Sequence, residues 1–227
     1  VIAMGYDSYM PAFEVLIPAL INAYSSLPNS DPLKQELKAP IALLQNWDYS
    51  SSETSEAAAL ALEWAPRLNP IIQKVYIDPG EKDQVENTIA FAKSARANQL
   101  LDPLKATITD LNKRFGKWQI AWGEINRFQR LTGAMNEIYD DNLVSIPVGN
   151  GSALWGQLAS YRSNQFKTNK RYGFSGNSFV CAVEFGPRIK AKSILAGGNS
   201  GDPNSKHFND QAAMYAKGEF KDVLFYK

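Results

Sequence analysis

Near its end the sequence reads Gly197-Gly198-Asn199-Ser200-Gly201-Asp202-Pro203-Asn204-Ser205-Lys206-His207-Phe208-Asn209-Asp210-Gln211. The glycines at its start indicate a tight loop, because glycine reaches backbone conformations that other residues avoid. The polar run that follows leads into a short apolar segment, and Asn204 or Ser205 is predicted to cap a terminal helix there. This combination of loop and polar run is the most diagnostic feature of the chain.

The same stretch contains the residue types of a serine-hydrolase triad. Ser200, His207 and Asp210 lie close together in the sequence. Triads assemble from distant segments, however, and the base is oriented by a group from elsewhere in the fold. A nucleophile turn would read Gly-x-Ser-x-Gly, whereas Asp202 stands where the last glycine belongs. We therefore favour a structural role, in which His207 hydrogen-bonds locally, over a catalytic triad.

The composition argues against several classes of function. Twenty-four Lys and Arg face 23 Asp and Glu, so no nucleic-acid partner is expected, because such proteins carry a clustered basic excess. The small basic group Lys167, Lys170 and Arg171 is predicted to be a solvated loop face. No apolar run approaches the roughly 20 residues of a membrane span. The single cysteine, Cys181, excludes an internal disulfide, and its strand-like surroundings predict a buried, inert thiol.

Metal sites are disfavoured as well. One histidine and one cysteine cannot form a typical structural zinc site. The densest carboxylate cluster, Glu137 with Asp140 and Asp141, lacks the alternating oxygen ligands and turn glycine of a calcium loop. A solvated turn is favoured there over a metal site, and no cofactor is expected in this chain.

Residues 1–116 are predicted to be mainly helical. Apolar residues recur at helical spacing from Tyr9 to Tyr24, so a helix is expected from Ser8 onward. Asp31-Pro32 is typical of a capping residue followed by proline at the first helical position. Pro40 is expected to kink the helix that follows.

Two further helices are expected in this half. Ser52 or Ser55 should cap an alanine-rich helix that runs to Trp64. A long helical stretch is predicted from about Lys82 to Phe115, with a possible division at Asp102-Pro103.

Residues 117–227 are predicted to hold mainly strands and a terminal helix. Apolar residues alternate in Trp118–Phe128, which favours a half-buried strand, and Asn142–Val148 is a second candidate. Phe179–Phe185 and Ala191–Leu195 are predicted to form two antiparallel strands around a turn. Helices followed by strands indicate an α+β protein rather than alternating β-α-β units.

Four motifs, in one order, resemble the β chain of the penicillin acylase family, which includes penicillin G, cephalosporin and acyl-homoserine-lactone acylases. Trp122-Gly123-Glu124-Ile125-Asn126-Arg127 is similar to that family's Trp-Gly-acid-x-His-Arg strand, with Asn126 in place of the usual His. Tyr6-Asp7-Ser8 and the Leu43–Trp64 stretch resemble its earlier segments. The terminal loop with His207-x-x-Asp210-Gln211 is the most specific match.

The resemblance implies the C-terminal portion of an αββα fold of the N-terminal-nucleophile hydrolases. Members are periplasmic or secreted and cleave their own precursor, which frees a β-chain N-terminal Ser that attacks the amide of an acylated small molecule. The resemblance also implies that a structural calcium, where a family member has one, is bound through residues upstream of this segment. Val1 has no hydroxyl or thiol, so the nucleophile is expected outside this chain, and no catalytic residue is assigned here. The segment 1–227 is therefore expected to be an incomplete catalytic domain, inactive alone.

The expected partners are the remainder of the acylase, namely its α chain and the N-terminal part of its β chain, and a small acyl amide substrate of the β-lactam or N-acyl-homoserine-lactone type. A non-catalytic binding or structural module with the same architecture is the alternative. The residues assigned to structural motifs are Trp122, Gly123, Arg127, Gly198, Asn199, Ser200, Gly201, His207, Asp210 and Gln211.

Overall fold

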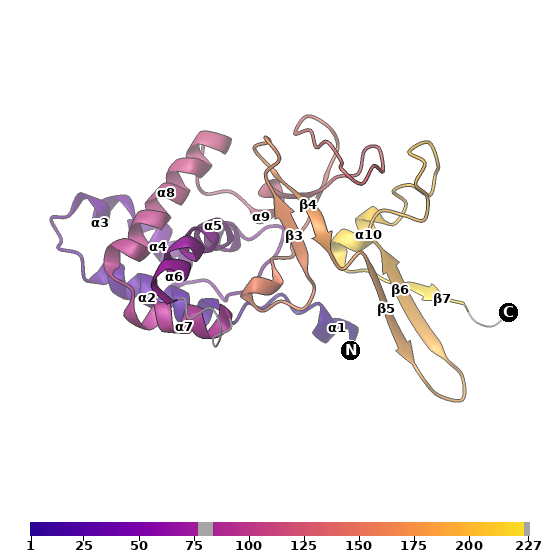
Figure 1. Ribbon diagram of the computed structural model, residues 1–227, viewed down its shortest axis with the longest axis horizontal. Coiled ribbons are helices and arrows are strands. Elements are labelled where there is room, and N and C mark those ends of the chain that lie inside the picture. Colours follow the sequence, from indigo (N-terminus) through magenta and orange to yellow (C-terminus); the bar gives the residue numbers. More distant parts are fainter. Residues whose placement is uncertain (77–83, 225–227) are drawn as a thin grey trace.

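The computed structural model describes residues 1–76 and 84–224. Most of the helices gather at one end of an elongated molecule, and the strands lie at the other together with the last helix (Figure 1). The helices are α1 (Ile2–Gly5), α2 (Phe13–Ser25), α3 (Pro32–Glu36), α4 (Lys38–Gln45), α5 (Glu56–Trp64), α6 (Asn69–Tyr76), α7 (Gln84–Ser94), α8 (Ala97–Phe115), α9 (Trp122–Ile125) and α10 (Ala212–Lys217). The strands are β1 (Asn126–Phe128), β2 (Ile146–Pro147), β3 (Tyr161–Asn164), β4 (Arg171–Gly176), β5 (Phe179–Glu184), β6 (Lys190–Leu195) and β7 (Lys221–Val223). This mixture confirms the α+β prediction.

The predicted helix starts are confirmed where a cap defines them. Asp31 accepts a hydrogen bond from the backbone N–H of Leu33 at 2.9 Å, with Pro32 at the first helical position. Ser55 accepts one from Ala58 at 3.1 Å and begins α5. Every residue of α5 after its first is buried, and the helix packs against α4, α8 and α9. The helical half is therefore organised around α5.

Several helix boundaries differ from the prediction. The first long helix begins at Phe13, because Tyr9 is held in an isolated antiparallel bridge with Ser50. The break expected at Pro40 lies instead at Leu37. Pro40 falls in the first turn of α4, where its missing N–H removes no intrahelical bond.

The long stretch predicted from about Lys82 divides at Ala95-Arg96, not at Asp102-Pro103. Lys82 itself lies outside the described residues. Arg96 is extended, and its backbone N–H donates to the Gln99 side chain, which starts α8. Pro103 is accommodated inside α8, since Leu100, Leu104, Ile108 and Leu111 are all buried and α8 packs along α2. This burial offsets the cost of about 3 kcal/mol of an interior proline.

The described strands form a four-stranded sheet in the order β2-β1-β4-β3 and a three-stranded antiparallel sheet in the order β5-β6-β7. In the first sheet β1 and β4 are parallel and the other pairs are antiparallel. The predicted hairpin is confirmed: β5 pairs with β6 in the register Phe179↔Leu195 to Glu184↔Lys190.

The other two strand predictions were too long. Of Trp118–Phe128 only Asn126–Phe128 is strand, and Trp122–Ile125 is one helical turn whose Trp122, Gly123 and Ile125 are buried. The alternating apolar residues before Asn126 therefore belong to a helical turn packed against α5, not to one face of a strand. Within 142–148, β2 covers Ile146–Pro147 alone. Cys181 is exposed on β5, which contradicts the buried thiol expected from its strand-like sequence.

Candidate functional site

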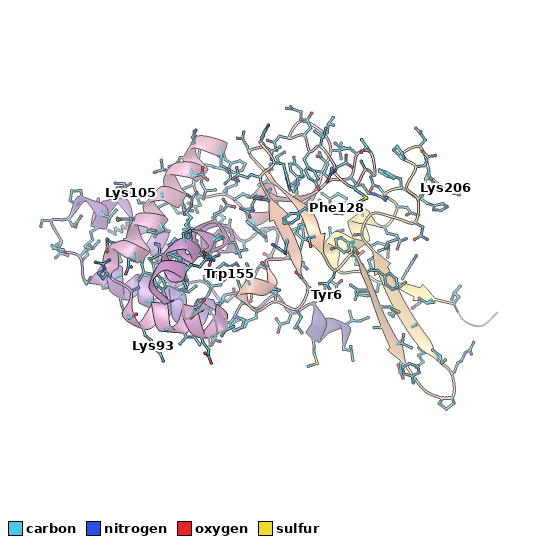
Figure 2. All side chains as sticks on the ribbon, viewed as in Figure 1. Tyr6, Lys93, Lys105, Phe128, Trp155 and Lys206 are labelled. Carbon is cyan, nitrogen blue, oxygen red and sulfur yellow. The ribbon has the colours of Figure 1, made fainter. Side chains whose placement is uncertain are left out.

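The C-terminal glycine loop closes around one arginine. Arg130, just after β1, donates from Nη1 to the Phe208 carbonyl at 2.5 Å and from Nη2 to the Ser200 carbonyl at 2.9 Å. Its guanidinium also lies 4.1 Å from the centre of the Phe208 ring. Lys206 marks the outer end of the loop in Figure 2. The arginine therefore fastens a segment some 70 residues away in sequence to the first sheet.

The tandem glycines are required by close approach. A side-chain carbon added at Gly198 would lie 2.2 Å from the His207 carbonyl oxygen and 2.6 Å from Asp210. Gly197 has a φ of +84° and lies against Arg130. Backbone bonds join the two sides of the loop, from Ser200 N–H to the His207 carbonyl at 3.1 Å and from Gln211 N–H to the Gly197 carbonyl at 2.8 Å.

The residue types of the triad lie in this loop with structural partners. His207 Nδ1 lies 2.8 Å from Asp210 Oδ2, as the local-bond prediction required, while the Ser200 hydroxyl accepts from the Asp202 N–H at 3.1 Å. The His207 side chain is 55% exposed. The predicted helix cap at Asn204 or Ser205 was wrong: α10 begins after Gln211 without a side-chain cap, and Ser205 accepts from the His207 N–H instead.

The second motif, Trp122 to Arg127, anchors the junction between the two halves. Gly123 donates its N–H to the Glu53 carbonyl at 2.8 Å, so close that a side-chain carbon would lie 2.8 Å from the same oxygen. Arg127 donates to the Gly123 carbonyl at 2.8 Å and to the Ser145 carbonyl at 2.5 Å. Trp122 donates through its indole N–H to the Asn150 carbonyl at 3.1 Å. The motif thus joins three loops through hydrogen bonds to their backbone carbonyls.

Asn126 occupies the place of the histidine expected from the family pattern. Its side chain is completely buried, and Nδ2 donates to the carbonyls of Val148 at 2.9 Å and Asn150 at 3.1 Å. Its Oδ1 has no hydrogen-bond partner among the described residues. The amide therefore supplies two donors to the loop after β2.

A buried charge cluster joins the halves at a point that sequence reasoning missed. Glu63 of α5 accepts from Arg114 of α8 at 2.5 Å and from Arg171 of β4 at 3.2 Å. The side chains of Glu63 and Arg114 are only 3% and 5% exposed. Arg114 also contacts Asp110, which binds Arg67. Arg171 was predicted to be part of a solvated basic face, and that prediction was wrong. The one available signal was a glutamate inside an alanine-rich apolar helix.

A hollow of about 230 Å³ lies beside the C-terminal ends of β1 and β4, where Tyr215 of α10 also lines it. Burial raises the pKa of Tyr215 to about 12, and burial also raises the pKa of Tyr161. Both phenols are therefore neutral hydrogen-bond donors near neutral pH. The lining of the hollow includes Phe128, Arg130, Met135, Tyr139, Tyr161 and Tyr215.

The one carboxylate that borders the hollow is already engaged. Glu137 accepts bonds from the backbone N–H groups of Leu131, Thr132 and Gly133 and from the Thr132 hydroxyl, at 2.8 to 3.1 Å. Partial burial raises the pKa of Glu137, but these hydrogen bonds outweigh burial, and its pKa is lower than usual. The described lining of the hollow thus combines aromatic side chains with a carboxylate that is already hydrogen-bonded.

The acidic turn is likewise engaged in bonds within the protein. Asp141 accepts from the backbone N–H groups of Asn169 and Lys170 and from the Tyr172 hydroxyl. Within residues 1–76 and 84–224, no three His, Cys, Asp or Glu side chains are grouped so as to hold a metal ion. Over the same residues, no helix has the length and apolar character needed to cross a membrane.

Comparison with known proteins identifies one family. The family model described as penicillin amidase matches residues 1–227. The acyl-homoserine lactone acylase PvdQ of Pseudomonas fluorescens is 26% identical over 84% of this chain, and that of Pseudomonas syringae pv. syringae 25% identical over 98%. These matches cover 24% and 28% of the relatives, so the chain spans about a quarter of their length. Among solved structures, a thermostable penicillin G acylase from Alcaligenes faecalis is similar to this chain, with 13% sequence identity and a TM-score of 0.43. The match covers 97% of this chain and 44% of the acylase chain.

Proposed function

The chain belongs to the penicillin amidase family, and we propose on that premise that it is the C-terminal part of an acylase β chain. The whole enzyme would hydrolyse the amide bond of an acylated small molecule. The match of the family model over all 227 residues carries this proposal. The short span relative to the curated relatives supports the idea that further polypeptide completes the enzyme.

In this proposal the nucleophile is an N-terminal serine located outside the chain, whose own α-amine acts as base. The contacts of His207 and Ser200 support a nucleophile that lies outside this chain. The single histidine is bonded to Asp210, and the Ser200 hydroxyl accepts a bond from its own loop. Neither side chain is arranged as a nucleophile and its base, which would need to be within hydrogen-bond reach of each other.

The role proposed for this chain is scaffold. Arg130 and Arg127 each bind backbone carbonyls of distant loops, and the glycines of both motifs allow chain segments to touch. Such contacts hold a catalytic fold in shape without touching substrate. The αββα architecture and a periplasmic or secreted location are part of the same proposal.

N-acyl-homoserine lactones come first among the substrates to test, because the matched curated relatives are acyl-homoserine lactone acylases. Penicillin-type β-lactams come second, from the name of the family. Both substrates present an acyl amide, so one hydrolytic chemistry serves either of them.

The test is the intact mass and N-terminal sequence of every polypeptide produced from the complete gene, followed by assays of homoserine lactone release. We expect two chains, the larger beginning with Ser and containing residues 1–227. Replacement of that serine by alanine should abolish hydrolysis. A single unprocessed chain that hydrolyses neither substrate would instead assign the protein to the non-catalytic module class.

A further inference from the structure

The β5–β6 hairpin projects from the body of the molecule (Figure 1) and has two faces of opposite character. In an antiparallel pair, residues that stand opposite each other point to the same face, and neighbours along a strand point to opposite faces. The register of β5 and β6 therefore sorts the hairpin into two sets. The first set, called here the apolar face, is Phe179, Cys181, Val183, Ala191, Ser193 and Leu195. The second, the charged face, is Val180, Ala182, Glu184, Lys190, Lys192 and Ile194.

The charged face is suited to water over its outer part. Glu184 lies 3.8 Å from Lys190 across the hairpin, and Lys192 lies 3.1 Å from Asp222 of β7. All four side chains are more than half exposed. Cross-strand pairs of opposite charge are typical of the solvated face of an antiparallel sheet.

The β5 side of the apolar face is exposed where a globular sheet would bury it, whereas Ala191 and Ser193 on β6 are buried. Phe179 is 61% exposed and Val183 is 43% exposed, and Cys181 between them is exposed as well. Phe185, directly after the strand, is also exposed. An antiparallel sheet with one charged face normally packs its other face on a core. Contiguous apolar exposure of this kind marks an interaction surface.

The outer side of β5 is also a sheet edge. Among the described strands β5 pairs with β6 alone, in the order β5-β6-β7. Edge strands of independent proteins are protected by proline, bulges or inward-pointing charges. From Phe179 to Val183 the strand has none of these: it holds no proline or charged residue, and its register with β6 is regular.

We propose that further polypeptide of the same acylase packs on the apolar face of this hairpin, placing an apolar segment against Phe179, Cys181 and Val183. This inference rests on the proposed function for its occupant. About three quarters of the length of the curated relatives lies outside the matched segment, which supplies ample chain for a second layer. The three-stranded sheet β5-β6-β7 gains stability when an apolar face is packed against other polypeptide, so an intramolecular partner is preferred over leaving the β5 side of that face in water.

The lone thiol provides the test, because Cys181 lies at the centre of the apolar face and is exposed in the absence of an occupant. The complete gene product is labelled with a maleimide, and mass spectrometry follows the peptide that contains residue 181. The control is Lys192→Cys in a Cys181→Ser background. Lys192 is next to the register partner of Cys181, yet it belongs to the charged face. Each rate is divided by the rate for the same protein unfolded in urea.

We expect Cys181 to react about 100-fold more slowly than when unfolded, since a buried thiol reacts only through opening events. The thiol introduced by Lys192→Cys should react at a rate close to its unfolded rate. Equal and rapid labelling at both positions would overturn the docking surface. Protection of Cys181 that is lost on dilution to monomers would assign the face to a second copy and overturn the proposed occupant.

Labelling does not depend on turnover, so the two proposals can fail separately. A complete protein that protects Cys181 but hydrolyses no acyl amide would remove the enzymatic proposal and leave the docking surface intact. An active enzyme with a freely reactive Cys181 would do the reverse.

Discussion

At the scale of single residues, the terminal loop depends on backbone contacts that leave no room for side chains. Gly198 faces the His207 carbonyl and the Asp210 carboxylate, whereas Gly201, three residues later, has nothing within 4 Å of an added side-chain carbon. Arg130 fills the remaining space and binds two carbonyls of the loop. The loop therefore combines one position that cannot accept a methyl group with one that can.

Gly198→Ala is expected to destabilise the protein by about 1 to 3 kcal/mol, the usual cost of forcing extra atoms into a packed site. Gly201→Ala is the matched control and should change the free energy of unfolding by less than about 0.5 kcal/mol. Urea unfolding followed by circular dichroism measures both. Equal losses for the two variants would contradict the close approach at Gly198.

At the scale of elements, Glu63 connects three of them. Its carboxylate, on α5, accepts hydrogen bonds from Arg114 of α8 and from Arg171 of β4. Arg114 also donates to the Asn169 carbonyl, in the loop before β4, at 2.6 Å. A charge taken out of water is tolerated only where partners surround it, and here those partners come from both halves.

Glu63→Gln is expected to cost about 3 to 5 kcal/mol, because it leaves two arginines facing a neutral group at a buried site. The control is Glu36→Gln, which removes the exposed partner of Lys105 and should cost less than about 1 kcal/mol. Thermal and urea unfolding would report the difference. A loss of under 1 kcal/mol at Glu63 would show that Asp110 alone can hold Arg114.

At the scale of the molecule, the core crosses the change from helices to strands. Trp122, Ile125 and Trp155 belong to the same buried cluster as the helices, and the rings of Phe13 and Trp155 lie 5.6 Å apart. Residues 1–116 therefore lack part of their own core. Figure 2 shows Trp155 where the two ends of the molecule meet.

A polypeptide of residues 1–116 is expected to lose cooperative unfolding and near-ultraviolet circular dichroism while keeping some helix, because its aromatic core is left uncovered. A cut after Phe220 removes only β7, an edge strand among the described strands, and the few residues after it. That variant should keep the transition of the 227-residue chain. A sharp unfolding transition for residues 1–116 would show that the helical half is an independent unit.

Agreement between sequence and structure is best where a few adjacent residues decide the outcome. Asp31 was recognised as a cap, and Ser55 was one of two candidates with Ser52, because a cap is a bond within three residues. The β5–β6 hairpin was recognised from alternation on either side of a turn. The family was recognised from glycines, tryptophans and acids in a fixed order, and the match over residues 1–227 confirms it.

The remaining features depend on neighbours that are distant in sequence. Alternation in Trp118–Phe128 resembled a strand, but packing on α5 made Trp122–Ile125 a helical turn. Cys181 looked buried by its local sequence, yet burial depends on what covers β5. Arg130 and Glu63 act through partners 51 to 108 residues away. Local bonding and periodicity were thus enough to establish the α+β class, and the resemblance of ordered motifs was enough to establish the family. The burial, charge pairing and exposed hairpin face of this protein followed from long-range packing, which no short stretch of sequence encodes.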